Sequence, residues 1–84
     1  MPTIEELKAK YRLDQLLAEI EKRGYVAFFG PGSWDDEKVY GYYCEIVAKD
    51  ADITEDGWGE EFRYKEMEDT IASALIWILE RGKE

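Results

Sequence analysis

An acidic stretch in the middle of the chain holds the residues most suited to chemistry. The segment DADITEDGWGEEF, residues 50–62, contains six carboxylates and an Asp-Gly pair. An EF-hand loop needs oxygen ligands at positions 1, 3, 5 and 12 and a glycine at position 6. A frame that starts at Asp52 places Arg63 at position 12, and a frame that starts at Asp50 places Glu55 at position 6. We therefore predict no metal site of this type, and leave open only weak, irregular divalent binding by clustered acids.

Catalytic chemistry is limited by the residue types that the sequence lacks. It contains no histidine, which excludes Ser-His and Cys-His nucleophiles and histidine-based metal sites. Cys44 is the single cysteine and lies in an apolar alternating stretch, where burial makes a thiol inert. The segment GPGS (30–33) lacks the lysine of a phosphate-binding loop. Solvated pairs such as Asp35 and Asp36 lack the pocket that separates the pKa values of catalytic acids. We predict no catalytic residue, no cofactor and no enzymatic activity.

The net charge of −9 is concentrated in one part of the 84-residue chain. Between Asp35 and Asp69 there are thirteen acids and four bases, so this segment carries the whole net charge and the remainder is neutral. Such a chain is repelled by phosphate backbones and anionic membranes and attracted to basic partners. A basic, nucleic-acid-binding protein surface is therefore the expected partner, without direct contact to nucleic acid or membrane.

The sequence leaves two interpretations of the acidic segment open. In one, Asp56-Gly57 is an ordinary hairpin turn and the acids only keep the loop solvated. In the other, the acids attract a basic partner, and tryptophan side chains are buried in the interface with it. The candidate partner-binding residues are Trp34, Asp35, Asp36, Glu37, Asp50, Asp52, Glu55, Asp56, Trp58, Glu60 and Glu61. Trp34 has an alternative role, in which Ser33 caps a short helical turn and the indole folds back onto the core.

The elements that must position these residues follow from hydrophobic periodicity. A helix is expected from Thr3 to Arg23, with a capping box at Thr3 and Glu6 and a stop at Gly24. Its apolar stripe changes face, which predicts a bend or break near residues 10–13, or burial of the first turns against another element. Strands are expected over residues 24–29, 39–49 and 58–64, and a last helix over residues 66–81.

These elements predict a single α+β domain over residues 1–84, with a three-stranded antiparallel sheet and both helices on one face. In the second strand the expected core face is apolar and carries Tyr40, Tyr42, Cys44, Ile46 and Ala48. A surplus of apolar side chains on the last helix and on the other strand face leaves a homodimer, or a homo-oligomer that binds a small ligand, as an alternative. A small subunit of a larger assembly is a further alternative.

The order of helix, three strands and helix resembles the double-stranded RNA-binding domain. That family carries lysines at the start of its last helix, where this sequence has Glu66, Met67, Glu68 and Asp69, so RNA binding is rejected. The layout, with its Tyr- and Trp-rich strands, acidic turn and closing DTIASALIWIL, also resembles small acidic phage proteins of the anti-CRISPR or anti-defence type. That resemblance carries over no residue. It implies an inhibitor of a bacterial defence complex, located in the cytoplasm of the host.

Overall fold

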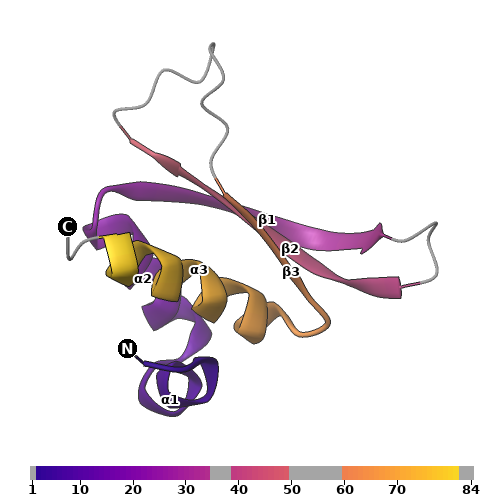
Figure 1. Cartoon of the computed structure of the whole chain (residues 1–84), viewed down its shortest axis with the longest axis horizontal. Helices are drawn as coiled ribbons and strands as arrows, with labels where there is room; N and C mark the ends of the chain where they lie inside the picture. The colour runs from indigo at the N-terminus through magenta and orange to yellow at the C-terminus, as the bar shows by residue number, and fades with distance from the viewer. Residues whose placement is uncertain (1, 35–38, 50–59, 82–84) are drawn as a thin grey trace.

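The computed structural model describes residues 2–34, 39–49 and 60–81, and for residues 33, 34, 39 and 40 only the backbone is considered. The chain forms an α+β fold, as predicted, and the first expected helix is divided into two (Figure 1). None of the helices described here is long and apolar enough to span a membrane. The elements are α1 (Ile4–Lys10), α2 (Leu13–Lys22), β1 (Tyr25–Trp34), β2 (Val39–Ala48), β3 (Glu61–Tyr64) and α3 (Met67–Arg81).

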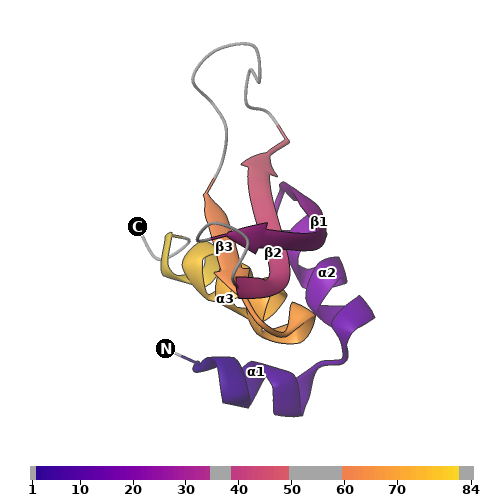
Figure 2. The same cartoon turned by 90° about the vertical axis from the view of Figure 1, so that its right-hand side faces the viewer.

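The sheet is antiparallel, with β2 between β1 and β3. Figures 1 and 2 show α2 and α3 on the same side of this sheet. The predicted core face of β2 is confirmed at Cys44 and Ile46, which are 0% and 1% exposed, whereas Tyr42 and Ala48 on the same face are half-buried. Cys44 and Ile46 join a core cluster with side chains from all three helices: Leu7, Leu16, Ile20, Ile71, Ala72, Ala74, Leu75 and Ile78.

The expected break in the first helix is present and separates α1 from α2. Tyr11 and Arg12 have extended backbones, and a new helix begins at Leu13. Each of these two helices has its own N-terminal cap. The Thr3–Glu6 capping box closes α1, and the amide of Arg12 donates to Oε1 of Gln15 at 2.8 Å at the start of α2. The break lets the two apolar stripes, which face different directions, be buried on different neighbours.

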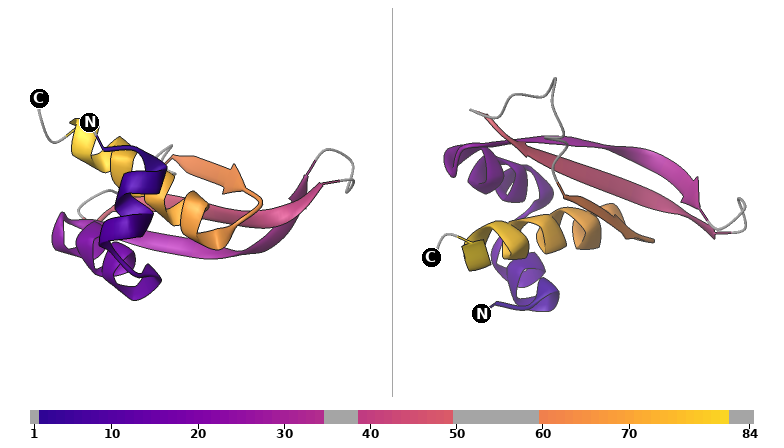
Figure 3. Two further views of the ribbon diagram at one scale, coloured as in Figure 1. Left: turned by 90° about the horizontal axis from the view of Figure 1, so that it is seen from below. Right: turned by 45° about the horizontal axis from the view of Figure 1, so that its top comes forward.

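Helix α1 packs against α3 rather than against the sheet, which gives the fold a third layer (Figure 3). The ion pair between Lys8 and Asp69 joins the two helices, with 2.7 Å between Nζ and Oδ1. The hydrogen bond and charge of the Asp69 carboxylate raise the pKa of Lys8. Helix α3 is therefore covered on several sides, and even the polar residues Thr70 and Ser73 are buried. Their hydroxyls donate to backbone carbonyls of Glu66 and Thr70.

Substituting either member of the Lys8–Asp69 ion pair is expected to destabilise the fold, but to different extents. Oδ1 of Asp69 is shielded from solvent. Lys8→Met leaves this charged oxygen without its cation, whereas Asp69→Asn removes the charge, so Lys8→Met should destabilise the fold more. Because the pKa of Lys8 is raised, the pair stabilises the fold up to the ordinary lysine range and is lost at higher pH. Urea midpoints of both variants at neutral pH test the order, and equal midpoints would contradict it.

Strand β1 is longer than predicted. The sequence predicted that it ends at Phe29, before Gly30, Pro31 and Gly32, but the strand continues to Trp34 and pairs with β2 along its whole length. Proline is tolerated because β1 is an edge strand, where a residue without an N–H can face away from the ladder. The alternative in which Ser33 caps a helical turn is therefore wrong, and Trp34 ends a strand instead of lying in a loop.

Two other boundaries differ slightly from the prediction. The described part of β3 begins at Glu61, while Trp58 and Gly59 lie outside the described residues. Helix α3 begins at Met67, one residue later than expected, and ends at Arg81, as expected. Gly24 ends the α2 turn with a φ of +91°, a conformation that favours glycine, as predicted for this stop.

Candidate interaction surface on the outer sheet face

One face of the sheet is turned away from all three helices (Figures 1 and 3), and we call it the outer face. Side chains alternate between the faces along a strand, and Cys44 and Ile46 define the inner one. Strand register then assigns the outer face: Val26, Phe28, Gly30 and Gly32 from β1, Gly41, Tyr43, Glu45 and Val47 from β2, and Glu61 and Arg63 from β3.

Aromatic side chains give this face exposed apolar surface. Phe28 is 52% exposed, the most of the large hydrophobic residues described. Tyr43 lies against two glycines of β1, since a Cβ at Gly30 would be 3.5 Å from its Cε1 and one at Gly32 would be 3.4 Å from its Cδ1. The ring thus fills the space that the glycines leave on the outer face. Val47, at the other end of the face, is buried but does not belong to the core cluster.

A row of three residues across the strands combines this apolar surface with negative charge. Phe28 is opposite Glu45, and Glu45 is opposite Glu61. The guanidinium of Arg63 donates to Oε1 of Glu61 at 3.0 Å, so one of the two carboxylates has a cation beside it. Carboxylates directly opposite each other repel, and a basic partner that binds there would relieve this repulsion.

The repulsion in this row predicts a stability gain when one charge is removed. Glu45→Gln keeps the shape of the side chain and should raise the free energy of unfolding by about 0.2–1 kcal/mol. Glu80→Gln, which removes an exposed acid of α3, is the matched control and should have less effect. Urea unfolding of both variants measures the difference. A loss of stability in Glu45→Gln would mean that Glu45 is compensated by a cation in the folded protein.

The structure describes few of the predicted partner-binding residues. Glu60 and Glu61 are exposed at the start of β3, and the carbonyl of Glu60 accepts a hydrogen bond from the amide of Ile46 at 3.1 Å. Trp34 is placed by its backbone at the end of β1. The others lie outside the described residues: Asp35, Asp36, Glu37, Asp50, Asp52, Glu55, Asp56 and Trp58.

Sequence reasoning missed Phe28 and Glu45 as site residues. Glu45 was assigned to the outer strand face, but its position opposite Glu61 depends on the register between β2 and β3. Phe28 lies in YVAFF (25–29), which is apolar on both faces, so alternation gave no signal there. Tyr43, which packs over the glycines of β1, lies on the same face.

The apolar surplus expected on the last helix is mostly used in packing. Trp77 meets Tyr25 and Phe62 edge to face, with ring centroids 6.3 and 6.5 Å apart. The guanidinium of Arg81 lies over the same indole at 4.6 Å. Trp77 is thus a contact between α3 and the sheet.

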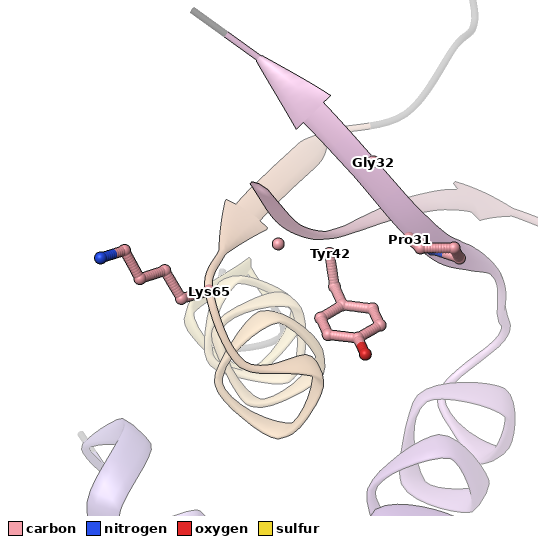
Figure 4. Close-up of a pocket in the computed structure, with 5 residues that line it drawn as sticks. Pro31, Gly32, Tyr42 and Lys65 are labelled. Atoms are coloured by element: carbon pink, nitrogen blue, oxygen red, sulfur yellow. The ribbon is translucent and has the colours of Figure 1, made fainter. Parts of the chain in front are cut away.

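A hollow of about 520 Å³ on the described surface is open and is lined by Pro31, Gly32, Gly41, Tyr42 and Lys65. Figure 4 shows that the Lys65 side chain extends away from Tyr42 instead of converging on it. Small-ligand sites usually combine an enclosed apolar pocket with a few converging polar groups. This hollow does not have that arrangement.

Cys44 is buried, and its thiol has a pKa raised to about 11, first by desolvation and then by the charge of Glu45. A thiol with a raised pKa stabilises the folded state fully below its unfolded pKa and loses that contribution as pH rises toward its folded pKa. We therefore expect the wild type to lose up to about 1.4 kcal/mol per pH unit more than Cys44→Ala above pH ~9. Urea unfolding at several alkaline pH values measures the two slopes, and parallel slopes would contradict the expectation.

No protein-family model matches this sequence, and comparisons with curated proteins and with solved structures likewise give no significant match.

Proposed function

We propose that this protein is a non-enzymatic inhibitor that binds a basic, nucleic-acid-binding surface of another protein. The observation that carries the proposal is the row formed by Phe28, Glu45 and Glu61 on a sheet face that none of the described helices covers. An exposed aromatic ring can become buried against a partner, and the carboxylates beside it attract a basic partner before contact is made. The net charge of −9 extends the steering beyond this row.

The class of partner follows from charge complementarity. A surface built to hold phosphates carries clustered lysine and arginine side chains, which an acidic protein can occupy in place of nucleic acid. A nucleic-acid-binding subunit of a bacterial defence complex is the partner that the resemblance to anti-defence proteins favours. Inhibition then needs no chemical step, because the bound protein excludes nucleic acid from its site.

Binding to purified nucleic-acid-binding subunits of bacterial defence complexes tests the proposal. Each subunit is immobilised in turn, and affinity is measured at about 50 mM and about 300 mM salt, a range over which screening of exposed charges changes strongly. We expect saturable binding to at least one subunit, weaker binding at high salt, and displacement of the protein by nucleic acid. Failure to bind any subunit, or binding that salt and nucleic acid leave unchanged, would overturn the proposal.

Matched double variants separate the position of the charges from their number. Glu45→Gln with Glu61→Gln removes two charges from the outer face, whereas Glu5→Gln with Glu80→Gln removes two exposed charges from α1 and α3. Both variants have the same net charge. Only the first should lose most of the affinity, and equal losses would place the binding surface elsewhere.

A further inference from the structure

Strand β1 forms one edge of the sheet, and no strand of the described chain pairs with its outer side. Edge strands of soluble proteins are commonly protected by charged side chains or are very short. Here β1 has ten residues, and the eleven residues from Gly24 to Trp34 include no charged side chain, in a chain that is 37% charged. Three of the four exposed large hydrophobic residues described lie on it: Val26, Phe28 and Phe29. Apart from Pro31, which is near its end, this edge therefore lacks the usual protection against pairing.

The backbone groups that point outward from β1 can be identified from its register. The amide of Lys49 donates to the carbonyl of Gly24 at 2.9 Å, so Gly24 faces β2. Successive residues of a strand alternate in the direction of their backbone groups. Tyr25, Ala27 and Phe29 therefore direct their N–H and C=O groups away from β2, toward the open edge of the sheet. Pro31, which has no N–H, belongs to the same outward series.

This series fixes how an identical strand can pair with β1. Two copies related by a two-fold axis pair antiparallel, and the same residues meet on both sides. With Ala27 opposite Ala27, Tyr25 meets Phe29, and the outward N–H groups of Tyr25, Ala27 and Phe29 are all used. A register centred on Phe28 or Phe29 brings Pro31, which has no donor, into the ladder and leaves the carbonyl opposite it unpaired. The register centred on Ala27 keeps Pro31 outside the ladder.

Side chains on the inner face are compatible with this register. Phe29 is 40% exposed, although it points to the same side of the sheet as the helices. Phe29 itself lines a groove of about 310 Å³ between α2 and β1, together with Leu17, Ile20 and Tyr25 and the charged residues Glu21 and Lys49. In the register centred on Ala27, Phe29 of one copy is opposite Tyr25 of the other. Each exposed ring would then enter the groove of its partner.

From these observations we infer that two copies of the chain associate through β1 to form a continuous six-stranded antiparallel sheet. The inference does not depend on the proposed inhibitor function. The outer faces of the two copies lie side by side in this assembly, so a binding surface on the outer face occurs twice, once on each copy. Because the two molecules carry like net charges, association strengthens with added salt, which is opposite to the salt dependence expected for a basic partner.

Sedimentation equilibrium and amide hydrogen exchange on the wild type test the dimer together. Between about 1 µM and about 1 mM protein, the mass should rise from 9.8 kDa toward twice that value. Over the same range, the amides of Ala27 and Phe29 should become protected. The amides of Val26 and Phe28, which face β2, should be protected throughout. A monomer at all concentrations, or a dimer that leaves the amides of Ala27 and Phe29 unprotected, overturns the inference.

Phe29→Lys and Tyr64→Lys form a matched pair for the edge. The two residues are 40% and 39% exposed and point to the same side of the sheet from its opposite edges. Phe29→Lys should weaken dimerisation at least tenfold, because it removes the inserted ring and charges the edge. Tyr64→Lys should leave dimerisation unchanged, and an equal effect of both variants would contradict pairing through β1. Circular dichroism checks that both variants fold, and the exchange test on the wild type holds in either case.

Discussion

Ile71→Ala is expected to lower the free energy of unfolding by about 2–5 kcal/mol, because it leaves a cavity in a close-packed interior. Ile71 is 0% exposed and belongs to the core cluster that joins α3 to α2, α1 and the sheet. A domain of this size is typically held by only about 5–10 kcal/mol, so this one truncation removes a large share of its stability. The urea midpoint should fall strongly, with little change in the denaturant slope.

Val26→Ala is the control for this core truncation. Val26 is 38% exposed and lies on the outer face, so its loss should cost less than about 1 kcal/mol. The pair tests whether the sheet is stabilised from one side only. If Val26→Ala were as destabilising as Ile71→Ala, the outer face would be a second core and would not be available as a binding surface.

Phe28→Ala should weaken binding to the basic partner by about 30-fold or more, the loss typical of a central aromatic anchor. Phe28 is 52% exposed in the described structure, so its truncation should change folding stability little. Tyr64→Ala is the control, since Tyr64 is 39% exposed on the opposite side of the sheet. It should retain wild-type affinity.

This measurement should be made at low protein concentration, where the β1 dimer is dissociated and cannot add avidity. An affinity unchanged in Phe28→Ala would remove the aromatic contact from the proposed site. The acidic row could still be tested on its own through the Glu45 and Glu61 variants. A loss in Tyr64→Ala equal to that in Phe28→Ala would instead place the contact on the helical side.

Local sequence signals identified most of the fold. The inner face of β2 was identified because the alternate positions that include Cys44 and Ile46 are all apolar, whereas the other face includes Glu45. The spacing of Ile71, Leu75 and Ile78 identified the buried stripe of α3. The shift of the apolar stripe near residues 10–13 predicted the break between α1 and α2. Each of these signals lies within one element, where periodicity alone separates buried from exposed positions.

The site was harder to predict because its residues come from three strands. Glu61 was selected for its charge, but Glu45 and Phe28 become its neighbours only through strand register. Pro31 and the glycines beside it are typical of a turn, so β1 was predicted to end early. An edge position reverses that expectation, because a proline N there need not face the ladder, and Tyr43 packs over both glycines.

The sequence by itself therefore determined the elements, the inner face of the sheet and the concentration of negative charge. Tertiary structure decided that α1 covers α3, that β1 runs on to Trp34 as an uncharged edge, and that an aromatic ring lies in one row with two carboxylates. The physical reason is the range of the interactions. Periodicity and capping act within one element, whereas register, edge position and helix stacking depend on contacts between residues far apart in the chain.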